Sequence, residues 1–187
     1  MSRALFDLHV VVDWSSAGAP KTGKDSIWIA VKSNDVTEVS NPATRSEAMQ
    51  ALDGILDAAN AKGQRVFIGF DFAFGYPEGL SKALGAHADW RDVWATIANE
   101  IEDADDNSNN RFDAASRLNQ MFDTDGPFWG NGLQRDIDGL PRTKPKGWGG
   151  TLPANKRAAE ACVNNAQEVW KLSGAGSVGG QALTGIA

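Results

Sequence analysis

Short apolar runs rich in β-branched and aromatic residues alternate with polar turns in the first part of the chain. They lie at residues 9–12, 26–31, 37–39 and 65–71. Such runs predict β-strands, because these side chains fit a pleated and partly buried surface. The loop between the first two runs is short, so we expect an antiparallel hairpin at the start of the sheet.

Helical spacing of apolar residues dominates the rest of the chain. The spacing from Ala48 to Ala59 predicts a helix over residues 43–61, between the third and fourth predicted strands. A helix that connects two strands allows them to run parallel, so we expect the last strand to lie parallel to the first. The same reasoning predicts further helices over residues 90–101, 111–121 and 154–172.

A segment rich in glycine, proline and tryptophan, residues 122–153, separates the last two predicted helices. Such a long aperiodic segment is usually a functional loop or disordered, and its aromatic residues favour an ordered loop packed on the body. A chain of 187 residues suits one domain. We therefore expect residues 1–187 to form a single α/β domain with a mixed sheet, helices packed on that sheet, and an irregular insertion at 122–153.

Charge and hydropathy narrow the choice of partners and of compartment. The net charge of −6 argues against broad electrostatic capture of nucleic acid, because that mode relies on lysine and arginine. No apolar run approaches the roughly 20 residues that a membrane-spanning helix needs. Asp7 and His9 interrupt the first apolar stretch, which lacks a signal-peptide cleavage site. We therefore expect a cytoplasmic protein without a membrane partner.

Two further features have ordinary structural interpretations. The lone cysteine, Cys162, excludes an internal disulfide, and its alanine-rich surroundings predict a small core residue in a helix. The acidic stretch around Asp103, Asp105 and Asn107 is similar to a calcium loop. It lacks the turn glycine and the bidentate glutamate, however. We expect a solvated acidic segment there.

Two aspartates each end an apolar run that predicts a strand, Asp13 after the first strand and Asp71 after the last. Open α/β sheets bind ligands at the carboxyl ends of their strands, where loops and helix termini converge. Two carboxylates in that setting can hold Mg²⁺ or Mn²⁺, which prefer oxygen ligands and keep waters for a substrate phosphate. We expect Asp13 and Asp71 to be metal ligands and catalytic residues; the alternative is that each only caps a turn.

The order of strand, Asp13, loop, strand, helix, strand and Asp71 resembles the first half of the ribonuclease H-like superfamily. The motifs VVVDWSS at 10–16 and GFDFAFGYP at 69–77 are similar to those of an uncharacterised family of predicted ribonuclease H-like nucleases, and the glycine-rich segment 176–185 is similar to a later segment of that family. The resemblance implies a ribonuclease H-like fold in which the first-strand aspartate is a metal ligand.

The resemblance also implies another acid near the C-terminus, whereas no acidic residue follows Glu168. We therefore expect a chain shortened relative to that family, in which Asp25, Asp123 or Asp125 would have to complete the metal site. A shortened sheet leaves an unpaired edge strand, which favours pairing with another chain. The sequence thus also predicts a homodimer.

The leading hypothesis is a divalent-metal-dependent hydrolase that acts on a phosphate ester, in a small molecule or in nucleic acid. Lys24, Arg142 and Lys144 are candidates to steady the phosphate charge. Tyr76, within the second motif, is a further candidate for substrate contact.

Two other functions remain open. The ribonuclease H-like superfamily includes actin-like sugar kinases, whose loop after the first strand cradles phosphate. In a nucleotide-dependent phosphotransferase of that type, Ser15 and Ser16 would contact phosphate and Asp71 would activate a hydroxyl group. The second alternative is a non-catalytic binding or scaffold protein that contacts a partner through its aromatic loop. Whether the chain is an enzyme is left open by the sequence.

Overall fold

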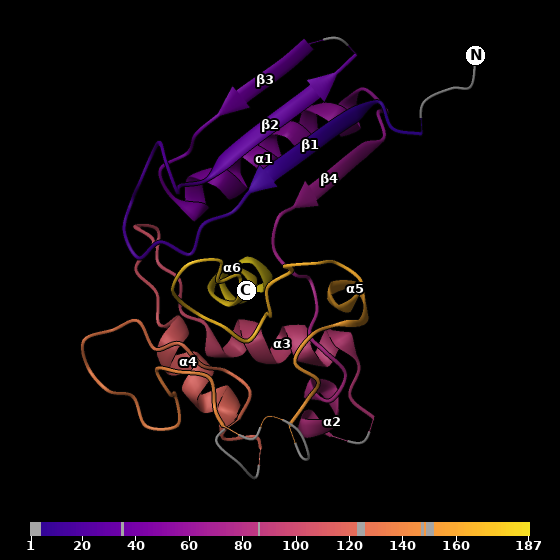
Figure 1. Ribbon diagram of the computed structural model, residues 1–187. Helices are drawn as coiled ribbons and strands as arrows, with labels where there is room; N and C mark the ends of the chain where they lie inside the picture. The colour runs from indigo at the N-terminus through magenta and orange to yellow at the C-terminus, as the bar shows by residue number, and fades with distance from the viewer. Residues whose placement is uncertain (1–4, 35, 86, 123–125, 147, 149–151) are drawn as a thin grey trace. The chain divides into compact units, whose positions relative to one another are not determined.

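The computed structural model describes residues 5–34, 36–85, 87–122, 126–146, 148 and 152–187 (Figure 1). Contacts divide the chain into two compact units. The first is Met1–Asp71 with Ala104–Ser108, and the second is Phe72–Asp103 with Asn109–Ala187. The expectation that the whole chain folds as one domain stays a prediction.

The first unit contains a mixed four-stranded sheet with the order β3-β2-β1-β4. Strands β1 and β2 are antiparallel, as are β2 and β3, whereas β4 runs parallel to β1. The sheet and its helices confirm the predicted α/β class, the opening hairpin and the parallel last strand. The strands are β1 (Leu8–Asp13), β2 (Trp28–Ser33), β3 (Val36–Ser40) and β4 (Val66–Phe70).

One face of the sheet packs against helix α1 (Arg45–Ala61) (Figure 1). Along β1, Leu8, Val10 and Val12 are buried while the residues between them are exposed, as expected for a strand with one covered face. The helix begins at the N-cap Thr44, whose hydroxyl accepts the Glu47 N–H at 3.1 Å. This cap satisfies one of the N–H groups that lack a partner within the helix.

The opposite face of the sheet leaves apolar side chains in solvent. Val11 lies on a central strand yet is 57% exposed. Its register partner Ala30, and Val39 which pairs with Ala30, share its face. Edge strand β3 is exposed along its whole length. Self-association through an edge strand stays a prediction.

The second unit is helical. Helices α3, α4 and α6 contact one another, and their buried residues include Ile97, Leu118 and Leu183. Among the described residues, no helix has the length and apolar character needed to cross a bilayer. The helices are α2 (Leu80–Leu84), α3 (Trp90–Glu100), α4 (Arg111–Asn119), α5 (Ala158–Ala161) and α6 (Gly179–Ile186).

The prediction of a helix over residues 154–172 is wrong. Only α5 is helical there, and Cys162 at its C-cap is exposed, so the core position expected for that cysteine is wrong too. Val169 and Trp170 are both fully buried, but they lie outside any helix. Instead the chain turns at Val169 and Trp170, and an isolated bridge joins Lys171 to Trp129 of the loop. In this bridge the Trp129 N–H donates to the Trp170 carbonyl at 3.1 Å.

The described part of segment 122–153 is an ordered irregular loop anchored by the buried Asn119. The Asn119 side chain donates to the carbonyls of Phe128 and Gly139 at 2.9 and 2.7 Å and accepts the Phe128 N–H at 2.8 Å. Phe128 is completely buried. A side-chain amide thus takes the place of a strand partner for the loop backbone.

Candidate functional site

The parallel pairing of β1 and β4 brings Asp13 and Asp71 together at one end of the sheet. Val12 pairs with Phe70, and the next N–H along β4, that of Asp71, donates to the Val12 carbonyl at 3.1 Å. The Asp71 carboxylate accepts the Trp14 N–H at 2.9 Å. The two carboxyl groups are close enough to share a hydrogen bond. The expected juxtaposition is therefore present within the first unit.

The surroundings of Asp71 disfavour its charged form. Partial burial raises the pKa of the Asp71 carboxyl group, and the negative charge and hydrogen bond of Asp13 raise it further, while the Trp14 N–H acts in the opposite direction. Like charges at one site resist joint ionisation. The pair is thus an acidic site that a cation or a shared proton would stabilise.

This repulsion predicts that Asp71→Asn raises the stability of the metal-free protein at pH 7. The folded-state pKa is raised, so the folded protein binds more protons than the unfolded chain between the two pKa values. Stability therefore falls as pH rises through the folded pKa. The amide removes one charge and keeps an oxygen for Trp14, and we expect a gain of about 0.5 kcal/mol, the scale of an exposed charge pair. Urea denaturation in EDTA measures it.

The gain should disappear near pH 3, where the carboxyl group is protonated in both states. Asp25→Asn is the matched control, because Asp25 is an exposed acid of the same unit. A loss of stability in Asp71→Asn at pH 7 would show that the pair is not repulsive.

Ser15 and Ser16 follow Asp13 in a loop that a buried arginine holds in place. Both serines are half-buried, and the Ser15 hydroxyl accepts the Ala17 N–H at 3.2 Å. The Arg45 guanidinium donates to the carbonyls of Ser15 and Ala17, each at 2.9 Å. The loop beside the first carboxylate is therefore fixed by a side chain from the start of α1.

Arg45 and Asn107 are positioning residues that the sequence reasoning missed. The Asn107 side chain accepts the Arg45 N–H at 2.8 Å and donates to the carbonyls of Ala19 and Ala43 at 3.2 and 3.1 Å. Asn107 is only 2% exposed, so the expectation of a solvated segment is wrong at this position. The sequence contained one indication of this role. Arg45 lies in the first turn of a helix, where a positive charge is unfavourable because it opposes the helix dipole.

Lys24 and Asp25 lie in the turn between β1 and β2, and both are exposed. Asp25 has a φ of 56°, a conformation that an aspartate tolerates in turns. Among the residues described, no group of three or more histidine, cysteine, aspartate or glutamate side chains is placed to hold a metal. Asp25 therefore does not complete the pair, and Asp123 and Asp125 lie outside the described residues.

The other predicted contact residues belong to the second unit, where two of them have structural partners. Arg142 donates to Asp136 at 2.8 Å and to the Leu133 carbonyl at 2.7 Å. Lys144 forms an ion pair with Glu168 at 2.8 Å. These bonds hold the irregular loop and occupy both cations.

Tyr76 packs on the rings of Phe128 and Trp170, with centroid distances of 5.7 and 5.1 Å. Its hydroxyl is buried and has no hydrogen-bond partner among the residues that the structure describes, and burial raises its pKa. Within the second unit, Tyr76 is thus part of an aromatic core.

The donor set of the carboxylate pair fits a hard divalent cation. Mg²⁺ is commonly held by one or two carboxylates, with waters and substrate phosphate as the remaining ligands. One oxygen of Asp71 is engaged by the Trp14 N–H, which orients the carboxylate as outer partners do around metals. Asp13 and Asp71 are the residues that would hold such an ion.

Comparisons with protein-family models, with curated proteins and with solved structures find no match for this chain. The fold and the site define an α/β protein with a mixed sheet and a pair of carboxylates at the ends of two neighbouring parallel strands.

Proposed function

We propose that this protein is a ribonuclease H-like, divalent-metal-dependent hydrolase that cleaves a phosphate ester, with nucleic acid as the substrate class. The observation that carries the proposal is the contact between Asp13 and Asp71. Two acids that repel each other destabilise the fold, and such arrangements cluster at functional sites. A structural role for the pair would not require both side chains to be acidic.

The sheet topology supports the same proposal. An antiparallel β1, β2 and β3 followed by a parallel β4 agrees with the strand order that the sequence motifs imply. In such a sheet the carboxyl ends of β1 and β4 form one edge, where ligands bind in open α/β folds.

A bound metal ion and the residues of the protein would have different roles in the reaction. A bound Mg²⁺ or Mn²⁺ would polarise the phosphate and lower the pKa of a water. Asp13 and Asp71 would orient that site, and the Trp14 N–H would keep Asp71 in position. In the hydrolysis, the water oxygen bonds to phosphorus, the ester P–O bond breaks, and the leaving oxygen takes up a proton.

Calorimetric titration of Mn²⁺ into the wild type, Asp13→Asn and Asp71→Asn tests the proposal. We expect each substitution to weaken Mn²⁺ binding at least tenfold, because each removes one of two anionic ligands. Asp25→Asn should leave the affinity unchanged. Circular dichroism confirms that each variant is folded.

Cleavage of single-stranded, double-stranded and hybrid nucleic acids with Mn²⁺ is the second measurement. Loss of at least about 100-fold in rate in both variants is expected if the pair carries the reaction. If the wild type binds no Mn²⁺ in the presence of any of these substrates, the proposal is wrong. ATP-dependent thermal stabilisation without nucleic acid cleavage would instead identify a phosphotransferase.

A further inference from the structure

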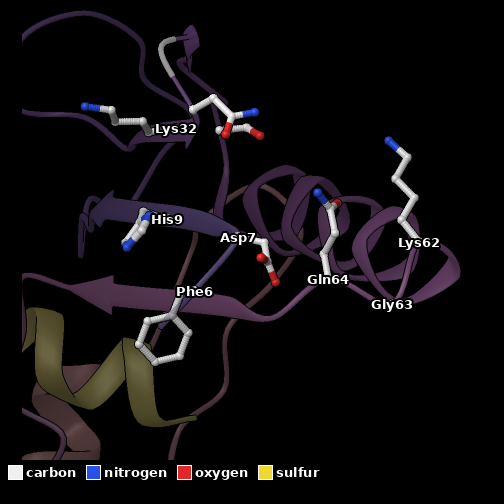
Figure 2. Close-up of a pocket in the computed structure, with 9 residues that line it drawn as sticks. Phe6, Asp7, His9, Lys32, Lys62, Gly63 and Gln64 are labelled. Atoms are coloured by element: carbon white, nitrogen blue, oxygen red, sulfur yellow. The ribbon is translucent and has the colours of Figure 1, made fainter. Parts of the chain in front are cut away.

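A second concave site lies in the first unit, at the opposite end of the sheet from the carboxylate pair (Figure 2). It is a cavity of about 510 Å³, within the range of ligand pockets. His9, one of its lining residues, precedes Asp13 by four positions on β1, which corresponds to about 13 Å along a strand. The cavity is thus separate from the proposed metal site. Its lining includes Phe6, Asp7, Lys32, Asn34, Lys62 and Gln64.

Among the described residues that line this cavity, two lysines face one acid, although the whole chain carries a net charge of −6. The acid Asp7 is neutralised by Arg65, with an N–O distance of 3.3 Å. Lys32 and Lys62 are exposed, and neither forms an ion pair within the described part of the chain. Figure 2 shows the two lysines on opposite sides of Asp7, with the Lys32 side chain extending away from Lys62. Two exposed ammonium groups therefore line one cavity.

An aromatic surface adjoins the charged rim. The rings of Phe6, His9 and Phe67 contact one another, with centroid distances from 5.5 to 6.2 Å. Phe6 and His9 line the cavity, and Phe67 is 46% exposed. Exposed rings that share a patch with lysines can stack a planar group while the lysines bind its phosphate.

We propose that this cavity binds a nucleoside monophosphate. The positive charges of Lys32 and Lys62 attract the phosphate, and the base stacks on the rings of Phe6 and His9. The side-chain amides of Asn34 and Gln64 supply donors and acceptors for the sugar or the base edge. Binding here requires neither a metal nor the carboxylate pair, so the site gives the protein a second, independent ligand.

Titration of AMP into metal-free protein in EDTA tests this site by calorimetry and by ¹H–¹⁵N spectra. We expect AMP to bind more tightly than adenosine or inorganic phosphate, because only AMP supplies both groups. The double variant Lys32→Ala with Lys62→Ala should weaken AMP binding at least tenfold. Phe6→Ala should weaken AMP binding and leave that of phosphate unchanged.

Two matched controls distinguish binding in this cavity from binding elsewhere on the protein. Lys21→Ala with Lys146→Ala removes the same charge from exposed positions that do not line the cavity, and should preserve binding. Asp13→Asn with Asp71→Asn should also preserve it, which separates this proposal from the metal site.

The proposal is overturned if AMP does not bind at millimolar concentration. It is equally overturned if the control lysine pair weakens binding as much as the cavity pair, since that indicates a general charge effect. Loss of AMP binding in the double aspartate variant would place the ligand at the carboxylates instead.

Discussion

Arg45→Ala is expected to lower the free energy of unfolding by about 3–4 kcal/mol, because it leaves one buried and two partly buried carbonyl groups without this donor. Arg45 is 3% exposed. Its guanidinium donates to the carbonyls of Ser15, Ala17 and Asn107, each at 2.9 Å. Water or a rearranged loop would have to replace these three hydrogen bonds. Urea denaturation followed by circular dichroism measures the loss.

The matched control is Arg65→Ala, which breaks an exposed ion pair with Asp7 and should cost about 0.5 kcal/mol. Arg45→Lys should fall between the two, because an ammonium group cannot span the same carbonyls. Equal losses for Arg45→Ala and Arg65→Ala would mean that the buried network contributes nothing.

Gly179→Ala is expected to destabilise the second unit by about 2–3 kcal/mol through overpacking. A Cβ at this position would clash with the carbonyl oxygens of Val169 and Lys171, which are backbone atoms that cannot rotate away. Val169 and Trp170 are fully buried beside them. The substitution must therefore move a core segment or the start of α6.

Gly54→Ala, the same glycine-to-alanine change in α1, is expected to raise stability. Gly54 lies on the exposed side of α1, and no atom of the described residues would lie within 4 Å of its added Cβ, apart from the helix's own backbone and its chain neighbours. Alanine in a helix interior is more favourable than glycine by about 0.5–1 kcal/mol, so stability should rise. Thermal denaturation compares the two variants. A neutral Gly179→Ala would show that the segment at 169–171 adapts freely.

Strand β1 and three of the helices could be predicted because each buries one face of a regular element. The exposed strand β3 was indicated by its β-branched residues alone. The alternating pattern of β1 and the helical spacing of α1 indicate, from nearby residues alone, which side chains are buried. Segment 154–172 contains good helix formers. Trp170, however, is buried in a core that includes Tyr76 and Phe128, which are distant in the sequence. Tertiary contacts override helix propensity there. Helix α6 begins with two glycines. Because glycine has low helix propensity, propensity does not predict this helix.

Part of the candidate site could likewise be predicted from the sequence, and part of it could not. The proximity of Asp13 and Asp71 follows from strand order and parallel pairing, both of which the sequence indicates. The link between Arg45 and Asn107 spans 62 positions, and no local pattern encodes it. Lys144 resembles a free cation in the sequence only because Glu168, its partner in the structure, lies far away in the chain.

The segment Ala104–Ser108 has a consequence for how the protein is made. It belongs to the first unit although the residues on either side belong to the second. An amino-terminal fragment cut after Asp71 would contain all four strands and α1, yet it would lack the amide that accepts the Arg45 N–H. During synthesis, the hydrogen bonds between Arg45 and Asn107 likewise cannot form until residue 107 has been added. The first unit can therefore be completed only after part of the second unit has been synthesised.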